Sequence, residues 1–404
     1  MVEVRKEHLA LYLAGAAAVS TLLSIAAFEI LMALALVAML VTRQKWRVPP
    51  IWLPLSLFFL GTLVSLAVSG HVRQGLPQVK KFYVYLMLFL VASAFREVKQ
   101  IRWLAIGWAL AAGLSSAWGM NQFAEKYLDA NYAHVNFYTA YVADRITGFT
   151  DHWMTFSGEM MIALLVTGSL VFFSTDRRWV GWLVAIGALL GVALLAAETR
   201  SMWGATAAGA VYLLWFWRRW TVLAVPALIG VVLLLNPFGM GERAISVLRP
   251  HGDTDSNAHR SMTRRIGYEM IKAHPWFGIG PEQVQYQYTD YLPPGTHLPL
   301  PTGYYGHLHN IYIHYAAELG VPAALMMVWM FARALFDFIR GLRRANSGAE
   351  QRWVLHAAIA VLIGVLIGGY FEKNIGDSEV LGLFLAVTGC GYAALAQTEE
   401  SCAA

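Results

Sequence analysis

Apolar segments long enough to cross a lipid bilayer follow one another along almost the whole 404-residue chain. Apolar residues make up 58% of the sequence and charged residues 14%, and the mean hydropathy is +0.51. A soluble domain is typically about half apolar and about a quarter charged. Because more than half of a folded surface is already apolar, a water-soluble core could not hold the excess. We therefore predict an all-α polytopic membrane protein.

The apolar segments divide into about twelve predicted transmembrane helices, since each crossing needs roughly 20 mostly apolar residues. The first segment, Leu9–Val41, is too long for one span and is expected to form a hairpin that turns near Ser24–Glu29. The other predicted spans are Ile51–Val68, Phe82–Phe95, Trp103–Phe123, Trp153–Ser174, Trp179–Ala197, Met202–Trp217, Thr221–Leu235, Ile311–Phe338, Trp353–Phe371 and Val380–Ala396. The predicted organisation is nine spans in residues 1–235, a long loop at 236–308 and three spans in residues 309–404.

The distribution of lysine and arginine predicts the orientation, because these residues are enriched in short cytoplasmic loops. If both termini are cytoplasmic, the cytoplasmic segments hold sixteen Lys and Arg residues and the shorter outer segments hold seven. The long loop holds six more, and long loops are exempt from the rule. The net charge of +5 thus reflects membrane orientation, and we expect membrane lipids but no nucleic acid as partners.

Several outer cations are candidate ligands for an anion. Arg200 lies in the turn Glu198-Thr-Arg200-Ser between two predicted spans, where it either pairs with Glu198 or binds a phosphate. Arginine suits phosphate because its planar guanidinium donates two hydrogen bonds at once. Lys81, beside Lys80 and after Pro77, either lies at the membrane boundary as an ordinary interfacial lysine or joins an anion site.

The segment Ser256–His274 in the long loop has the pattern of an amphipathic helix. Its apolar face carries Met262, Ile266, Met270 and Ala273. Arg260 and Arg264 project together on the other side, and Arg265 lies between the two faces. These arginines either contact lipid headgroups or join Arg200 in binding a diphosphate.

A histidine at the start of the tenth predicted span is the candidate general base. His309 lies at the outer membrane boundary, and histidine exchanges protons near ambient pH. His314 and Glu318, four residues apart, are expected to pair with each other on a different face. His309 could also have a purely structural role.

Two metal-binding alternatives stay open. One is zinc held by His307 and His309 together with His314 or His297, and the other is a divalent metal at Asp253 and Asp255. Neither has a recognisable ligand spacing, and no P-loop, dinucleotide fingerprint or Gly-x-Ser-x-Gly motif is present. We expect no cofactor.

The segments around Arg200, Arg260 and His309 follow one another in an order that resembles the O-antigen ligase and polymerase superfamily of bacterial membrane glycosyltransferases. The matching motifs are Thr199-Arg200-Ser201, then Arg260 to His274-Pro275-x-x-Gly278-x-Gly280, then His309-Asn310 with Glu318-Leu-Gly320, and more weakly Arg145-Ile-Thr-Gly148. In the family, an aromatic residue stands a few positions after the loop arginine, whereas this chain has Arg264 at that position. The equivalent arginine is therefore open among Arg260, Arg264 and Arg265.

The resemblance implies a GT-C-like fold and a lipid-linked polysaccharide ligase of the Gram-negative inner membrane. The donor would be O-antigen linked to undecaprenyl diphosphate, the acceptor would be the lipid A–core oligosaccharide, and the long loop would face the periplasm. The diphosphate would be bound by Arg200 and the loop arginines Arg260, Arg264 and Arg265, together with Lys81 and Arg145. His309 would be the base of a metal-independent, inverting transfer.

Three other functions compete with ligation. An O-antigen polymerase and a protein O-oligosaccharyltransferase share the chemistry and differ in the acceptor. A lipid or polysaccharide transporter belongs to another class, but transporters usually have repeated halves and ionisable groups near the membrane midplane. Here the chain has no evident repeat, and the polar clusters lie at the outer boundary.

Overall fold

The computed structural model describes residues 2–245, 256–296, 298, 300, 305–346 and 350–403, and helices without strands make up its regular structure. The α-helices are α1 (Val2–Ser20), α2 (Ile25–Val41), α3 (Trp52–Ser69), α4 (Val72–Lys80), α5 (Leu86–Ala94), α6 (Val98–Tyr132), α7 (Phe137–Ala143), α8 (Trp153–Phe173), α9 (Val180–Ala196), α10 (Arg200–Arg218), α11 (Ala224–Leu235), α12 (Met240–Ile245), α13 (Ser256–Ala273), α14 (Val284–Gln287), α15 (Ile311–Leu319), α16 (Val321–Arg344), α17 (Gln351–Phe371) and α18 (Ser378–Ala403). The 3-10 helices are η1 (Lys81–Tyr85), η2 (Arg219–Leu223), η3 (Pro237–Gly239), η5 (Tyr288–Tyr291) and η6 (Asn374–Gly376).

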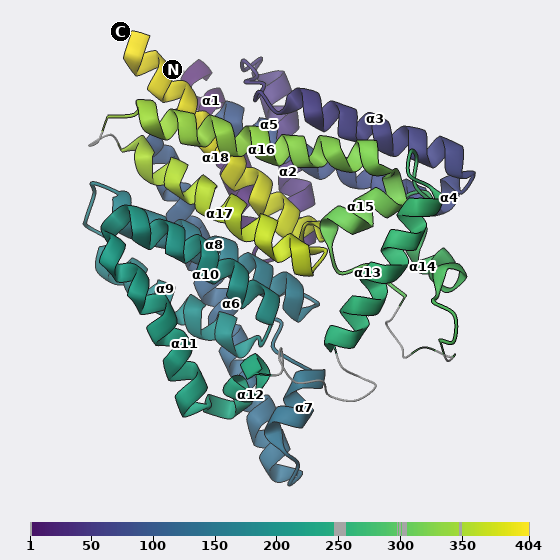
Figure 1. Ribbon diagram of the computed structural model, residues 1–404. Coiled ribbons are helices and arrows are strands. Elements are labelled where there is room, and N and C mark those ends of the chain that lie inside the picture. Colours follow the sequence, from purple (N-terminus) through teal and green to yellow (C-terminus); the bar gives the residue numbers. More distant parts are fainter. Residues whose placement is uncertain are drawn as a thin grey trace.

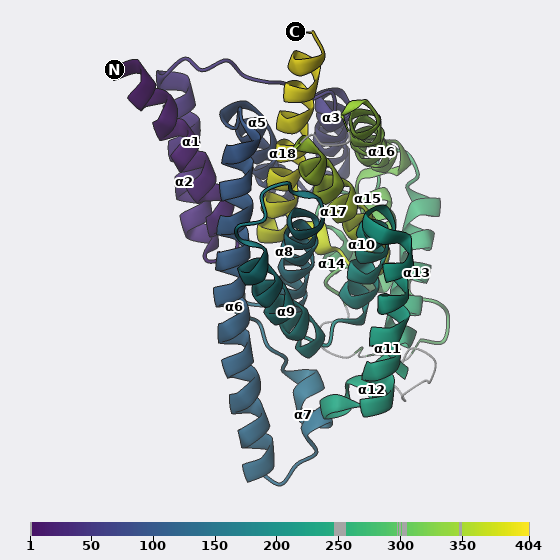
Figure 2. The same cartoon turned by 90° about the vertical axis from the view of Figure 1, so that its left-hand side faces the viewer.

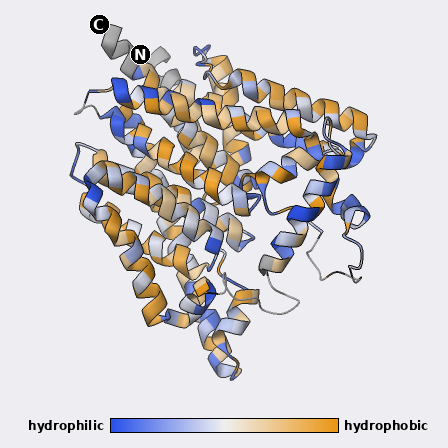
Figure 3. Cartoon of the chain, in the orientation of Figure 1, coloured by the Kyte–Doolittle hydropathy of each residue, from blue (hydrophilic) through white to orange (hydrophobic). Residues whose placement is uncertain are grey.

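Six helical segments of the described residues are long and apolar enough to cross a membrane. They are Trp52–Ser69, Trp153–Phe173, Arg200–Leu235, Val321–Arg344, Gln351–Phe371 and Ser378–Gln397. Three shorter apolar helices accompany them, at His8–Ser20, Ile25–Val41 and Val180–Ala196. Figure 3 shows the apolar character of these helices along their lengths and the hydrophilic surface of α13. The chain is thus a helical protein with several apolar helices, and the count of twelve spans stays a prediction.

The helices pack around a core formed by α8, α17 and α18. Among the apolar segments, these three are the most buried inside the protein, whereas most of Arg200–Leu235 faces outward. The predicted N-terminal hairpin is confirmed, since α1 and α2 pack against each other and turn at residues 21–24. In Figure 2 this hairpin lies at one edge of the bundle, beside α6.

Helix α6 is longer than the predicted span Trp103–Phe123. Its 35 residues correspond to about 52 Å, whereas the hydrocarbon core of a bilayer is about 30 Å thick. Figure 2 shows α6 running past the other helices to meet α7. There Phe123 packs edge-on against Phe137 and Tyr141, so that an aromatic cluster fixes the projecting end.

The predicted tenth span, Ile311–Phe338, is wrong as one continuous helix. The chain breaks at Gly320 into α15 and α16, and Gly320 adopts φ +87° and ψ 158°. Two features of the sequence explain the break. Only glycine reaches this backbone conformation without strain, and Pro322 cannot donate the hydrogen bond that would continue α15.

The turn at residues 275–280 forms backbone hydrogen bonds with residues on both sides of Gly320. Ile279 and Gly280 donate hydrogen bonds to the carbonyl oxygens of Ala317 and Glu318 at 2.9 Å each, and Val321 donates to Pro275 at 2.8 Å. A Cβ atom added to Gly278 would lie 2.2 Å from the Glu318 carbonyl oxygen. Gly278 of the Pro-x-x-Gly-x-Gly motif therefore lets one backbone approach another closely.

The amphipathic helix predicted at Ser256–His274 is confirmed as α13. Ile266 and Met270 are buried on its apolar face, in a cluster with Ile313 of α15. A Cβ atom at Gly267 would lie 2.4 Å from the Ile313 side chain, so α13 packs closely on α15. The arginine-bearing face of α13 is consequently held in a fixed orientation next to the segment that carries His309.

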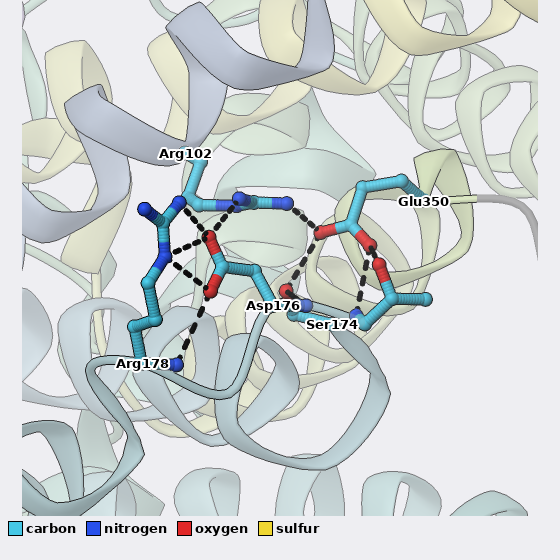
Figure 4. Close-up of polar contacts among 6 residues, drawn as sticks. Arg102, Ser174, Asp176, Arg178 and Glu350 are labelled. Carbon is cyan, nitrogen blue, oxygen red and sulfur yellow. Dashed lines mark hydrogen bonds and ion pairs between the residues drawn. The ribbon is translucent and has the colours of Figure 1, made fainter.

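A cluster of charged side chains connects Arg102 with Asp176 and Glu350, as Figure 4 shows. Arg102 of α6 donates to Asp176 at 2.6 Å and also pairs with Glu350, which precedes α17. Glu350 in turn accepts a 2.6 Å hydrogen bond from Ser174. Hydrogen bonds from Ser174, Thr175 and Arg102 outweigh burial and lower the pKa of Glu350. The cluster ties the α8–α9 turn to α6 and α17.

Candidate functional site

His309 lies just before α15 and is oriented by the residue that follows it. The Asn310 side chain accepts a hydrogen bond from the Ile313 backbone at 2.9 Å and donates one to the Tyr370 carbonyl at 2.8 Å. Asn310 thus caps α15 and ties its start to the end of α17. His309 itself has φ +46°, an uncommon value for a non-glycine residue. The result is that its imidazole lies beside Glu372, which caps α17.

Glu372 connects the histidine with an arginine of α13. Its Oε2 lies 2.7 Å from Nδ1 of His309, and its Oε1 accepts a hydrogen bond from Arg260. The side chain is only 1% exposed. Burial alone would raise the pKa of Glu372, but the hydrogen bond from His309 and the charge of Arg260 lower it below its ordinary value. Glu372 is therefore an anion at neutral pH.

The other ring nitrogen of His309, Nε2, is the candidate proton acceptor. A carboxylate beside Nδ1 assigns the proton to that atom, which leaves the lone pair on Nε2. Nε2 of His309 faces Nε2 of His259 at 3.1 Å. Burial, with the charges of His309 and Arg260, lowers the pKa of His259 to about 4, and burial also lowers the pKa of His307 well below its ordinary value. Both neighbours of His309 are thus neutral.

Four of the predicted site residues line a single cavity of about 600 Å³, which we call the α13 cavity. They are Arg200, Arg260, Arg264 and Arg265. Arg264 also lies over the ring of Tyr370, with its guanidinium carbon 4.8 Å from the ring centroid. No acidic residue lines this cavity among the described residues. A concave surface with four guanidinium groups is suited to an anion with several oxygen atoms.

Arg145 does not line the α13 cavity. Its side chain is 8% exposed, with its guanidinium carbon 4.5 Å from the centroid of the Trp153 ring. One guanidinium nitrogen donates to the Glu198 carbonyl at 3.2 Å. Burial and the nearby Arg243 lower the pKa of Arg145 to about 10, so it stays protonated. The structure thus places Arg145 as a support for the turn that presents Arg200.

Lys81 lies in a different cavity, of about 340 Å³, which we call the Lys81 cavity. Its ammonium donates to the Gly376 carbonyl at 2.6 Å, and burial and the charge of Lys373 lower its pKa. The cavity is also lined by His307 and Glu372. Since Glu372 pairs with Arg260, the His309–Glu372 pair lies between the Lys81 cavity and the α13 cavity.

The structure decides two of the alternatives left open by the sequence. The Glu198 carboxylate is buried and has no partner among the described residues, so the salt bridge between Arg200 and Glu198 does not form. The predicted pair of His314 and Glu318 is confirmed, with 3.2 Å between Nε2 and Oε2. His314 therefore belongs to the packing of α15.

No group of three or more potential metal ligands occurs in the part of the chain that the structure describes. His307 and His309 are neighbours, with ring centroids 4.2 Å apart, but no carboxylate or cysteine completes a set with His314. The other residues proposed for metal binding, His297, Asp253 and Asp255, lie outside the described residues.

Sequence reasoning missed Glu372 and His259 as partners of His309. Glu372 follows the apolar segment Trp353–Phe371 directly, and a carboxylate at a predicted outer boundary was the available signal. His259 stands one residue before Arg260 in the amphipathic segment, but its proximity to His309 depends on how α13 packs against α15.

Residues 185–328 match the family model described as O-Antigen ligase. A comparison with curated proteins gives no match. The matched region contains Arg200, α13, His309 and the Gly320 break, so it includes the α13 cavity's arginines and the histidine beside them. The chain has several apolar helices as well. Residues 185–328, which hold these arginines and His309, are thus similar to the O-antigen ligase family.

Proposed function

We propose that this protein is an O-antigen ligase that transfers O-antigen polysaccharide from undecaprenyl diphosphate to the lipid A–core oligosaccharide. The observation that carries the proposal is the convergence of Arg200, Arg260, Arg264 and Arg265 on one cavity, with Glu372 linking Arg260 to His309. A glycosyl transfer of this kind needs charge stabilisation for a leaving diphosphate and a base for the acceptor hydroxyl. The site has candidates for both.

The α13 cavity would bind the diphosphate of the donor. As the bond between the anomeric carbon and the diphosphate oxygen breaks, negative charge develops on that oxygen. Cations held in place before the reaction stabilise such charge without reorganising. Arg200 comes from the start of α10 and the other three arginines come from α13, so the diphosphate would be held between two elements. Arg145 would act indirectly, by supporting the turn before Arg200.

His309 would remove the proton of the acceptor hydroxyl as its oxygen attacks the anomeric carbon. Nε2 would accept this proton, because Nδ1 is occupied by Glu372. The anionic Glu372 would stabilise the imidazolium that forms. The acceptor hydroxyl would take the place of His259 next to Nε2. One displacement, with attack opposite the leaving diphosphate, would invert the configuration at the anomeric carbon.

The orientation proposed for the reaction follows from the charge distribution of the sequence. Both termini would be cytoplasmic, and the 236–308 loop would face the periplasm of a Gram-negative cell. The α13 cavity and the Lys81 cavity would then open where a lipid-linked donor and a lipid-anchored acceptor can both reach them from the outer leaflet of the inner membrane.

The lipopolysaccharide of a deletion strain tests the function. Loss of all polymer from the core, with lipid-linked polymer retained, would support a ligase. A core that carries one repeat unit would instead identify a polymerase. Normal lipopolysaccharide together with a missing glycan on an exported protein would identify a protein O-oligosaccharyltransferase. Complementation by the wild-type chain and failure with Arg200→Ala would tie the phenotype to the α13 cavity.

A further inference from the structure

A second arginine-lined cavity lies at the other end of α16, far from His309. Arg340 follows Gly320 by 20 residues, which corresponds to about 30 Å along the helix axis. Figure 1 shows the C-terminal end of α16 on the same side as the two chain termini, with α13 and α15 on the other side. We call it the α16 cavity, and its volume is about 440 Å³.

The lining of the α16 cavity is strongly cationic. Among the described residues, its charged lining consists of Arg47, Arg333, Arg340, Arg344 and Asp337. Arg333, Arg340 and Arg344 share one face of α16, because residues seven and eleven positions apart on a helix point in similar directions. Arg47 comes from the segment before α3, so the charges converge from two parts of the chain.

Among the described residues, Arg333 has an ion-pair partner, whereas Arg340 and Arg344 have none. Arg333 donates to Asp337 at 2.9 Å, and Asp337 also accepts a hydrogen bond from Tyr392 at 3.1 Å. Arg340 and Arg344 are exposed, and within the described residues their guanidinium groups have no hydrogen-bond or ion-pair partner. The cavity thus presents donors that a bound anion would satisfy.

The surroundings of the α16 cavity are apolar. Phe336 lies between Arg333 and Arg340 along α16 and is 57% exposed, and Val48 at the rim is 59% exposed. The base is firmly packed, since a Cβ atom at Gly341 would lie 1.9 Å from the Leu395 side chain of α18. A ligand that fits here has a phosphate group for the arginines and hydrocarbon for the exposed apolar side chains.

We propose that the α16 cavity binds the phosphodiester headgroup of an anionic phospholipid. Basic pockets between transmembrane helices bind such headgroups on the cytoplasmic side, where anionic lipids attract lysine and arginine. The alternative is that these are ordinary interfacial arginines, whose side chains simply extend toward water. Such a role requires neither a cavity with a packed base nor guanidinium groups from two segments of the chain, and the α16 cavity has both. The lipid's acyl chains would lie along Phe336. This site is separate from glycosyl transfer and would fix the ends of α16 and α18 in the membrane.

Lipid-dependent thermal stability of the purified full-length protein tests the proposal. Phosphatidylglycerol or phosphatidylcholine is titrated into the detergent-solubilised protein, and inorganic phosphate is titrated separately. We expect phosphatidylglycerol to raise the unfolding temperature saturably, with no comparable effect of phosphatidylcholine or inorganic phosphate. Stabilisation by inorganic phosphate alone at similar concentrations would contradict a lipid ligand, and equal stabilisation by phosphatidylcholine would contradict headgroup recognition.

A neighbouring pair of arginines provides the matched control. Arg344 lines the α16 cavity, whereas the exposed Arg343 of the same helix does not. Arg344→Gln should weaken phosphatidylglycerol binding about fivefold, as expected for one arginine near an anionic headgroup, and Arg340→Gln/Arg344→Gln should weaken it further. Arg343→Gln removes the same charge and should bind as the wild type does. Equal weakening in Arg343→Gln and Arg344→Gln would show that net charge alone attracts the lipid, and the site would be overturned.

Discussion

At His309 the two ring nitrogens have different partners, and this difference assigns their roles. Nδ1 lies 2.7 Å from the buried carboxylate of Glu372, whereas Nε2 faces the neutral His259. A carboxylate partner fixes the tautomer and the ring orientation of a catalytic histidine. The same carboxylate accepts from Arg260, so a change in the α13 cavity can reach His309 through one side chain.

Glu372→Gln should separate this positioning role from packing, because glutamine keeps the size and removes the charge. We expect kcat to fall by roughly 10²-fold or more, since general-base catalysis contributes about 10²–10⁴-fold. The acidic limb of the pH–rate profile should move to lower pH, because a neutral partner stabilises the protonated imidazole less. Glu318→Gln, beside His314, is the control and should affect stability without moving the profile. A wild-type profile in Glu372→Gln would contradict the assignment.

Glu198 predicts a pH dependence of stability. Its carboxylate is buried without a partner among the described residues, and burial raises its pKa to about 7 against the opposing charges of Arg243 and Arg145. The unfolded carboxyl titrates near pH ~4.3. Between these two pKa values the Glu198 carboxyl is protonated in the folded protein and ionised in the unfolded chain. The free energy of unfolding therefore falls as the pH rises toward 7 and stays low above it.

Glu198→Gln should therefore be more stable than the wild type at pH 8, and this gain should disappear at pH 5. Thermal unfolding in detergent at the two pH values measures it. Glu269→Gln, which removes an exposed carboxylate paired with Lys272, should show no such difference. A gain that is the same at pH 5 and pH 8 would show that the carboxylate is not the cause.

At the scale of elements, the turn at residues 275–280 and the break between α15 and α16 form one unit. Their backbones exchange three hydrogen bonds, and Gly278 and Gly320 each lie where a Cβ atom would come within 2.2 Å of a carbonyl oxygen. Because α13 ends at this turn and α15 begins after His309, the unit sets how the arginines are placed relative to the histidine.

Gly278→Ala should destabilise the protein strongly, and Gly295→Ala should do so much less. Both glycines have positive φ, +68° and +83°, so alanine at either costs about 1–3 kcal/mol of backbone strain. At Gly278 the added Cβ would also meet a backbone oxygen, whereas no atom of the described residues lies within 4 Å at Gly295. Unfolding temperatures of the two variants measure the difference. Equal losses would mean that the close backbone approach contributes nothing.

The elements also show how far the sequence alone could predict this site. Periodicity predicted α13 and its arginine face correctly, because amphipathic patterns depend on local spacing. Hydropathy could not reveal the break at Gly320, since the residues on both sides are apolar. Gly320 and Pro322 were the local signals, and the hydrogen bonds to the turn at residues 275–280 are not visible in the sequence. Glu372 was missed for a related reason: its partners lie 63 and 112 residues away along the chain.

At the scale of the whole molecule, Arg340 of the α16 cavity lies about 30 Å along α16 from Gly320, which is next to the turn that follows α13. This length is close to the thickness of the hydrocarbon core of a bilayer. The arginines at the two ends would then face opposite sides of the membrane. This arrangement agrees with the orientation that the loop charges predict, in which residues 340–352 are cytoplasmic and residues 236–308 are periplasmic.

Reporter fusions test this topology. A reporter that works only in the cytoplasm should be active when it is joined at Ala404, and a reporter that works only in the periplasm should be active when it is inserted near residue 252. The expected pattern follows from the excess of lysine and arginine in one set of loops. Periplasmic activity at Ala404 would overturn either the number of spans or their orientation.

Whether four arginines bind the donor diphosphate while His309 acts as the base can be tested directly in one reconstituted transfer assay. Purified protein receives lipid-linked polymer and lipid A–core in the presence of a chelator, and both donor binding and the rate of core-linked product are measured. We expect turnover by the wild type and weaker donor binding with Arg200→Ala. For His309→Ala we expect near-normal donor binding and a roughly 10²–10⁴-fold slower reaction. Wild-type rates in correctly folded His309→Ala, or activity restored only by adding a divalent metal, would contradict these roles.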